Sequence, residues 1–126
     1  MIEIYLTRHG ETLENAQGIL QGHQPGHLSH LGIEQAESLR DELADTHFDN
    51  IVVSDLQRAI DTARILNEPH GLRLTQTHLL RERDWGVFTG QHITDIRILP
   101  KDFPPSVESP LQLQQRARIF LRFLFK

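Results

Sequence analysis

The sequence predicts an α/β fold in three layers, with a mostly parallel sheet flanked by helices. Three segments with the pattern of β-strands alternate with three segments of helical periodicity. Such alternation is typical of parallel strands joined by right-handed crossovers. The 126 residues correspond to one ordinary domain. We therefore expect a single α/β domain over residues 1–126, with its ligand site at the carboxyl ends of the strands.

Three short segments have the residue pattern of strands. Apolar and polar residues alternate over residues 2–6, before a turn at Gly10. Residues 51–53 form an apolar β-branched run, which is typical of a strand covered on both faces. A third strand is predicted over residues 72–77. The strands should therefore occur in this order, each followed by a helix or loop.

Capping signals mark the predicted helices. Ser29 is a plausible N-cap for the first helix. A capping box over residues 54–57 opens the second, and another over residues 109–112 opens the last, with proline at its first helical position. The helices are expected to end at about Asp45, Leu66 and Leu124. Thr89 to Pro105 shows no clear period and holds three of the six prolines, which predicts a surface excursion.

Composition excludes several classes of protein. Seventeen acidic residues against thirteen Lys and Arg give a net charge of −4, which argues against nucleic acid as the main partner. The longest apolar runs fall well short of the roughly 20 residues that a membrane-spanning helix needs. The chain has no cysteine, so disulfides, thiolate metal sites and a cysteine nucleophile are excluded. The first residues lack the pattern of a signal peptide, and we therefore expect a cytoplasmic location.

Polar side chains of reactive types follow each predicted strand. Their joint placement favours a phosphate site, because two arginines can each bind a phosphate bidentately and a helix N-terminus adds oriented N–H groups. A neutral imidazole is a competent nucleophile toward phosphorus when cations surround it. A carboxyl group could protonate the departing alcohol and later accept a proton from water. These residues are Arg8, His9 and Glu11 after the first strand, Ser54 and Arg58 after the second, and Glu82 after the third.

The same residues stand in motifs that resemble the histidine phosphatase superfamily, which includes cofactor-dependent phosphoglycerate mutase and fructose-2,6-bisphosphatase. The resemblance is clear over residues 1–90 and continues faintly through the helix after Glu108. It implies a phosphoglycerate mutase-like fold that lacks its last strand or strands. The matching motifs are Leu6–Thr12, Gln21-Gly22, Leu28-Ser29 with Gly32 and Gln35-Ala36, Ser54–Ala59 with Thr62-Ala63, and Leu80–Glu82 with Trp85-Gly86 and Gly90.

The resemblance also implies roles for individual residues. His9 would be the phosphohistidine nucleophile, Glu82 the proton donor, Arg8 and Arg58 the phosphate clamps, and Asn15 a substrate contact. Gln21 and Gly22 are placed with the residues that bind substrate or phosphate. Gly10 is placed there too, because it lets the backbone come close to the phosphate, although a simple turn glycine would explain it as well. Trp85 is expected to pack beneath the Glu82 loop.

Complete members of the family continue into a further strand that ends in Ser-His-Gly and supplies a second active-site histidine. No histidine follows His92 in this sequence. We therefore expect a truncated member of the family, or one that a second chain completes. An exposed sheet edge and the apolar face of the last helix would favour self-association. The solvated face of that helix is expected to carry Arg116, Arg118, Arg122 and Lys126.

The leading hypothesis is a phosphatase that hydrolyses a small phosphorylated metabolite through a phosphohistidine on His9, without a metal or other cofactor. One alternative is a truncated or degenerate member that binds phosphate with little or no turnover, and another is mutase-type phosphoryl transfer. A metal site at His23, His27 and His30 is disfavoured, because a proline and a glycine between them break any helix that would align them.

Overall fold

The computed structural model describes residues 1–98 and 100–125. Leu99 in the predicted excursion and Lys126 in the predicted basic face lie outside the described residues. Short 3₁₀ turns lie between β2 and α4 at His78–Leu80, Gly86–Phe88, Ile93–Asp95 and Pro100–Asp102. In chain order the helices and strands are α1 (Leu13–Ala16), α2 (His30–Leu43), β1 (Ile51–Ser54), α3 (Gln57–Leu66), β2 (Leu74–Thr77) and α4 (Pro110–Leu124).

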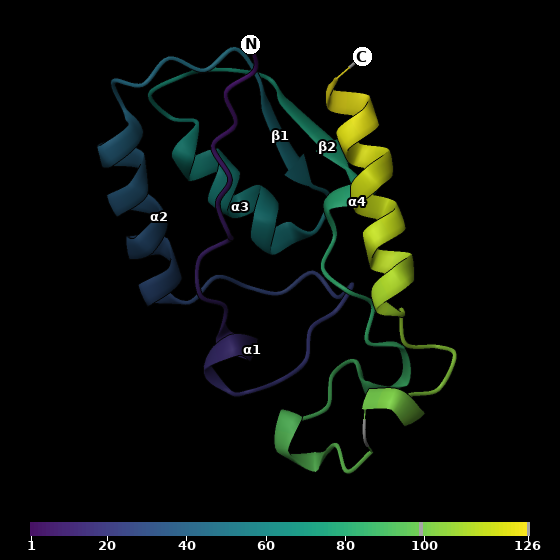
Figure 1. Ribbon diagram of the computed structural model, residues 1–126. Helices are drawn as coiled ribbons and strands as arrows, with labels where there is room; N and C mark the ends of the chain where they lie inside the picture. Colours follow the sequence, from purple (N-terminus) through teal and green to yellow (C-terminus); the bar gives the residue numbers. More distant parts are fainter. Residues whose placement is uncertain (99, 126) are drawn as a thin grey trace.

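The described strands form a short parallel sheet between two helical layers. β1 pairs with β2 in parallel, with Ile51 opposite Leu74 and Ser54 opposite Thr77. Helices α2 and α3 lie on one side of this sheet and α4 lies on the other (Figure 1). The carboxyl ends of both strands point toward the end of the molecule that carries α1 (Figure 1). The three-layer arrangement and the strands predicted at 51–53 and 72–77 are confirmed.

The strand predicted over residues 2–6 is wrong for the described part of the chain. This segment is extended, but the described sheet consists of β1 and β2 alone. Its side chains are exposed, and Leu6 is 91% exposed. An alternating pattern favours an extended backbone, but a strand also needs a neighbouring strand that completes its hydrogen bonds. In the view of Figure 1 the segment instead runs past α3. The Tyr5 ring meets the Phe48 ring edge-on, with 5.1 Å between the ring centroids.

The predicted caps of two helices are confirmed. Ser29 accepts a hydrogen bond from Gly32 N and begins α2, which ends at Leu43, slightly before the predicted end. Ser109 and Gln112 form the reciprocal capping box of α4. The capping box predicted over residues 54–57 is wrong, because the N-cap of α3 is Leu56. Ser54 Oγ accepts from the backbone N of Leu56, so it closes the turn before the helix.

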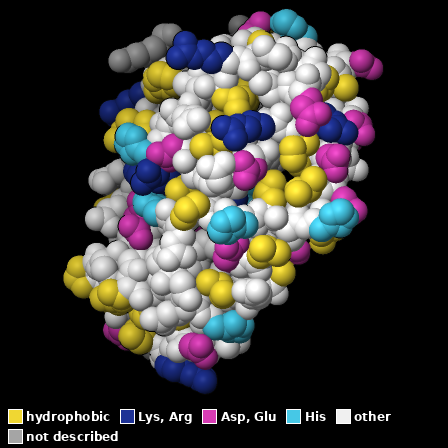
Figure 2. Space-filling model, turned by 180° about the vertical axis from the view of Figure 1, so that it is seen from behind, with side chains coloured by type: hydrophobic (Ala, Val, Ile, Leu, Met, Phe, Trp, Pro, Cys, Tyr) yellow, Lys and Arg dark blue, Asp and Glu magenta, His cyan; other side chains and the backbone are white. Residues whose placement is uncertain are grey.

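The buried apolar core is small, and much apolar surface faces outward. Figure 2 shows apolar side chains scattered among charged and histidine side chains on the face turned away from the viewer in Figure 1. Self-association through α4 or the sheet edge stays a prediction. The core consists of Ala36, Val53, Leu56, Ile60, Ala63, Phe88 and Val107, whereas exposed side chains on α4 include Leu111, Ile119, Leu121 and Phe123.

The excursion predicted over residues 89–105 is only partly a surface loop. Its described part contains two of the 3₁₀ turns and packs back through Phe103. The Phe103 ring lies 6.1 Å from the Trp85 ring and 5.4 Å from the Phe88 ring. The excursion therefore covers the segment that carries Glu82 and Trp85.

No helix in the described part of the chain is long and apolar enough to cross a membrane.

Two glycines hold the segment that carries His9 against the N-terminus of α2. A Cβ on Gly10 would overlap the carbonyl group of Gly32, and a Cβ on Gly32 would overlap the carbonyl oxygen of Glu11. The backbone N of Gly10 also donates to Thr62 Oγ1 on α3 at 3.1 Å. The backbone at His9 is therefore anchored to α2 and α3 at once.

Candidate active site

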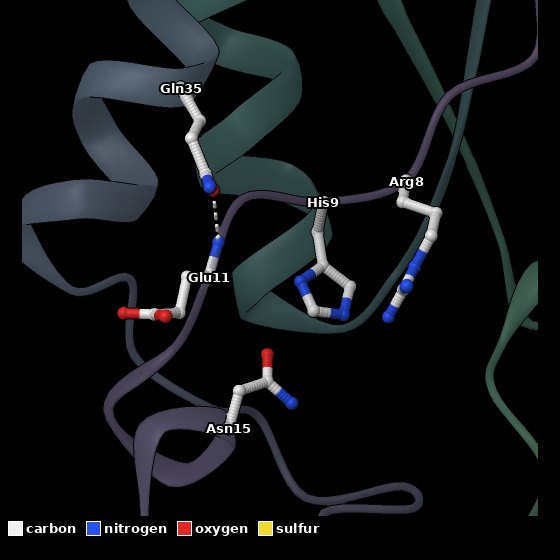
Figure 3. A pocket seen from close by; sticks show the side chains of 5 residues that line it. All are labelled: Arg8, His9, Glu11, Asn15 and Gln35. Carbon is white, nitrogen blue, oxygen red and sulfur yellow. Dashed lines mark hydrogen bonds between the residues drawn. The ribbon is translucent and has the colours of Figure 1, made fainter.

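A polar cavity of about 350 Å³ lies beside the His9 ring (Figure 3). The N-terminal segment, α1 and α2 each contribute to its wall. The side chain of Gln35 accepts from the backbone N of Glu11 at 3.0 Å, which ties the wall to α2. The structure thus brings together four of the residues singled out from the sequence, Arg8, His9, Glu11 and Asn15. The lining residues are Arg8, His9, Glu11, Asn15 and Gln35.

The hydrogen bonds of His9 determine which ring nitrogen can act as a nucleophile. Nδ1 lies 2.6 Å from the carbonyl oxygen of Gly10, which can only accept, so Nδ1 carries the proton. The Nε of Arg58 donates to Nε2 at 3.3 Å, which requires a lone pair on Nε2. The geometry therefore selects the tautomer in which Nε2 is the nucleophilic nitrogen.

The surroundings of His9 favour the neutral ring. Burial lowers the pKa of His9 below its usual value of 6.5, and the cations Arg58 and Arg8 act in the same direction. The hydrogen bond to the Gly10 carbonyl and the Glu82 carboxylate oppose this lowering of the pKa. The net result is an imidazole that stays unprotonated, and hence nucleophilic, to lower pH than a free histidine.

Arg58 is fully buried at the second position of α3, and the N–H groups of its side chain donate hydrogen bonds to several acceptors. One terminal nitrogen donates to the carbonyl oxygen of Gln24 at 2.5 Å. The other donates to the carbonyl of Gly22 and to Glu82 Oε2, both at 2.9 Å. Burial lowers the pKa of the guanidinium, and the Glu82 carboxylate opposes this, so Arg58 remains a cation. These contacts hold the guanidinium within hydrogen-bond distance of His9 Nε2.

Glu82 completes a continuous chain of contacts with His9 and Arg58. Its side chain is 41% exposed, and its Oε1 accepts from the indole N–H of Trp85 at 3.2 Å. The sequence predicted that Trp85 packs beneath this loop, and the structure adds that Trp85 orients the carboxylate. Imidazole, guanidinium and carboxyl therefore lie together, although they come from three separate parts of the chain.

The remaining predicted residues have different surroundings. Asn15 lines the cavity, and its Oδ1 accepts from the backbone N of Thr12 to cap α1. Gln21 and Gly22 are buried beside Arg58 and do not line the described cavity. The Oε1 of Gln21 has no hydrogen-bond partner among the described residues. Phosphate binding by Gln21, Gly22 and Gly10 stays a prediction, and the position of Gly10 is explained by its close approach to α2.

The backbone N–H groups at the N-terminus of α3 are less available to a ligand than the sequence predicted. The first-turn N–H groups were expected to face phosphate, but one of them, the backbone N of Arg58, donates to the carbonyl of Pro25 at 3.0 Å. The histidines of the disfavoured metal site also diverge. His27 faces Glu14, and His30 faces Glu34. Within residues 1–98 and 100–125, no group of three or more side chains is arranged to hold a metal.

Sequence reasoning missed Glu108 and misplaced Arg116. Arg116 was expected on the solvated face of the last helix, but its side chain is 17% exposed and bonds Glu108 through two nitrogens. The two residues stand eight positions apart and Glu108 lies outside the helix, a spacing that carries no strong sequence signal. An acidic residue just before the N-cap of α4, followed by arginine, was the available clue. Arg118 and Arg122 are exposed, as predicted.

The lowered pKa of His9 predicts a stability loss in mildly acidic solution. Below its usual pKa of 6.5 the unfolded chain binds a proton at His9 while the folded chain still resists it. The free energy of unfolding should therefore fall as the pH drops between about 7.5 and 5.5. Urea unfolding at the two ends of this pH range measures the fall in the free energy of unfolding. The pKa values of Glu14, Asp55 and Glu108 are lowered as well, from usual values of 4.5, 3.8 and 4.5. These carboxyl groups therefore affect the free energy of unfolding only at pH values below this window.

The control for this prediction is His9→Asn, which removes the titrating ring. It should flatten the decline of the unfolding free energy with falling pH. An equally steep decline in the variant would show that His9 is not responsible.

Comparison with known proteins identifies the family of this chain. The family model for the histidine phosphatase superfamily (branch 1) matches residues 4–125. The chain belongs to this superfamily. Among curated superfamily members, the probable fructose-2,6-bisphosphatase TIGAR A of Danio rerio is 34% identical over 96% of this chain. The probable phosphoglycerate mutase GpmB of Yersinia pestis is 35% identical over 76% of it.

Solved structures of the histidine phosphatase superfamily share the arrangement of this chain. A mycobacterial glucosyl-3-phosphoglycerate phosphatase in complex with VO3 superposes with a TM-score of 0.83 at 31% identity, over 93% of this chain and 64% of that one. The α-ribazole phosphatase of Shigella flexneri gives 0.84 at 30% identity, over 92% and 63%. These matches confirm the predicted phosphoglycerate mutase-like fold. The chain spans about half the length of the curated relatives, 52% of TIGAR A and 45% of GpmB.

Proposed function

We propose that this chain carries a phosphomonoesterase site that hydrolyses a small phosphorylated metabolite through a phosphohistidine on His9. The observation that carries the proposal is the pair of bonds made by Arg58. Its Nε contacts His9 Nε2 at 3.3 Å, and its terminal nitrogen contacts Glu82 at 2.9 Å. Nucleophile, phosphate-binding cation and proton donor therefore meet within one contact chain, as a phosphoryl transfer requires.

In the first step, the incoming phosphate takes over the Arg58 donors that bind His9 Nε2 and Glu82, which frees the Nε2 lone pair. His9 Nε2 then attacks phosphorus, and the bond from phosphorus to the ester oxygen breaks. Glu82, in its protonated form, gives its proton to the leaving alkoxide. In the second step, water attacks the phosphohistidine while the Glu82 carboxylate takes up the water proton. The N–P bond breaks, phosphate leaves, and His9 returns to its neutral form. Arg58, whose Nε lies beside Nε2 before the substrate binds, donates to the phosphoryl oxygens instead and stabilises their charge in both steps.

The substrate class follows from the cavity and from the relatives. A cavity of about 350 Å³ lined by an arginine, a histidine, an asparagine and a glutamine, with one carboxylate from Glu11, suits a small polar phosphate ester. The names of the relatives refer to fructose 2,6-bisphosphate, glucosyl-3-phosphoglycerate and α-ribazole phosphate. We infer a phosphorylated sugar or related small metabolite as substrate, processed in the cytoplasm, without a nucleic-acid partner.

Trapping the intermediate tests this proposal. The 126-residue protein is mixed with a ³²P-labelled sugar phosphate or phosphoglycerate and quenched in base. We expect label that is stable in base and lost in acid, together with release of inorganic phosphate. Transfer of label to a second acceptor instead of water would identify a mutase. Binding of vanadate in calorimetry without label or phosphate release would reject hydrolysis and identify a phosphate-binding protein.

A further inference from the structure

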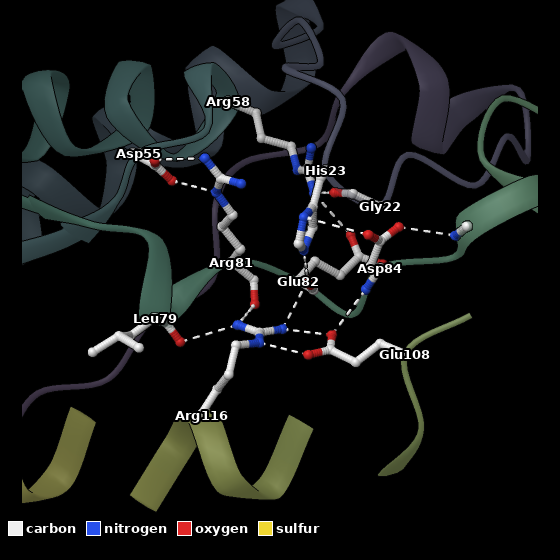
Figure 4. A network of polar contacts seen from close by, with 11 residues as sticks. Gly22, His23, Asp55, Arg58, Leu79, Arg81, Glu82, Asp84, Glu108 and Arg116 are labelled. Atoms are coloured by element: carbon white, nitrogen blue, oxygen red, sulfur yellow. Dashed lines mark hydrogen bonds and ion pairs between the residues drawn. The ribbon is translucent and has the colours of Figure 1, made fainter. Parts of the chain in front are cut away.

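Arg116 reaches from α4 to the backbone of the segment that ends at Glu82 (Figure 4). One terminal nitrogen donates to the carbonyl oxygens of Leu79 at 3.1 Å and Arg81 at 2.9 Å. The other donates to the carbonyl oxygen of Glu82 itself at 3.2 Å. A single side chain therefore binds three carbonyl groups within four consecutive residues.

Glu108 holds Arg116 in place and also bonds to the part of the same segment that follows Glu82. Its carboxylate accepts from Arg116 Nε at 2.6 Å and from a terminal nitrogen at 2.7 Å, which is the bidentate geometry that fixes a guanidinium plane. Its Oε1 also accepts from the backbone N of Asp84 at 3.0 Å, and its carbonyl accepts from Arg83 Nε at 2.7 Å. Contacts from Arg116 and Glu108 thus hold the backbone before and after Glu82 (Figure 4).

These contacts matter because the segment itself is irregular. Residues 81–85 lie between two 3₁₀ turns and belong to no described helix or strand, so the backbone ladder of a regular element does not hold them. Side chains supply the restraint that regular structure supplies elsewhere. Besides Arg116, the ring of His23 contacts the carbonyl oxygen of Glu82 at 2.9 Å.

We propose that Arg116, held by Glu108, is a positioning residue that sets where the Glu82 carboxyl lies relative to Arg58 and His9. The inference rests on the proposed function, because it assigns a task to the backbone that carries the proton donor. A displacement of about 1 Å at a reacting group can cost on the order of 10²-fold in rate. Loss of Arg116 should therefore weaken proton donation while the nucleophile and the phosphate-binding cation remain in place.

Leaving groups of different acidity separate this role from general destabilisation. A p-nitrophenolate leaves from phosphate without much help from an acid, whereas a simple alkoxide needs a proton. We expect Arg116→Gln to lower kcat/KM for an alkyl phosphate by roughly 10- to 100-fold, and for p-nitrophenyl phosphate by less than about 3-fold. Arg118→Gln is the matched control, because Arg118 is exposed on the same helix, and it should change neither value.

A double-mutant cycle with Glu82→Gln makes the test sharper. If Arg116 acts through Glu82, adding Arg116→Gln to Glu82→Gln should cost little further alkyl phosphatase activity. Additive losses, or equal losses on both substrates, would overturn the proposal. Glu108→Gln should reproduce the selective loss more weakly, and Arg116→Lys should restore part of the activity, since one ammonium group reaches fewer of the carbonyls.

Amide hydrogen exchange separates failure of this proposal from failure of the proposed function. Arg116→Gln should speed exchange at residues 79–84, and Arg118→Gln should not. If the wild-type protein hydrolyses neither substrate, the proposed function has failed, and exchange at this segment alone decides the positioning role. Unchanged exchange in Arg116→Gln, or faster exchange spread over the whole chain, would contradict it.

Discussion

His9→Ala should abolish the phosphoenzyme and reduce phosphate release by about four orders of magnitude or more, as removal of a covalent nucleophile does in other enzymes. The physical reason is that the lone pair on Nε2, beside the Arg58 guanidinium, is the group that attacks phosphorus in the proposed reaction. Alanine offers no lone pair, and water would have to attack an anionic ester directly. Quenched labelling and initial rates of phosphate release measure the two effects.

The matched control for this substitution is His30→Ala. His30 lies at the start of α2 with its side chain 89% exposed and paired with Glu34. We expect this variant to keep both the label and the rate. Base-stable, acid-labile label that persists in His9→Ala would place the nucleophile elsewhere and refute the proposed reaction.

Arg58→Gln should impair both stability and activity. The side chain is 2% exposed, and the carbonyl groups of Gly22 and Gln24 both accept from it. Leaving two such acceptors without donors should cost about 2–4 kcal/mol in the free energy of unfolding. Removing the cation beside His9 Nε2 should lower kcat by roughly 10²- to 10³-fold. Urea unfolding and steady-state kinetics measure the two losses.

Two further variants test the reason for these losses. Arg64→Gln changes an arginine on the same helix whose side chain is 66% exposed, and it should shift stability by less than about 0.5 kcal/mol. Arg58→Lys keeps the charge but not the planar fork, so it should recover only part of either loss. Full activity in Arg58→Lys would show that charge alone matters, and full stability in Arg58→Gln would contradict the role of the buried carbonyl bonds.

Local sequence patterns predicted most of the regular structure. The apolar run at residues 51–53, the N-cap Ser29 and the capping box of Ser109 each act through near neighbours in the chain, and each element formed where expected. The strand at residues 2–6 did not form in the described chain, because a strand depends on a distant partner that no local pattern supplies. The cap of α3 differed for a similar reason, since the carbonyl of Pro25 binds the backbone N of Arg58.

The sequence by itself determined which groups could do the chemistry. An imidazole, two arginines and a carboxyl group follow the predicted strands, and the order of elements carried His9, Arg58 and Glu82 to one end of the fold. Only the tertiary structure decided how these groups are held. It placed Arg58 against Nε2 of His9, set the carbonyl contacts around Arg58, and turned Arg116 inward to bind the backbone at Glu82. These features depend on distances between groups far apart in the chain, which are fixed only when the layers pack together.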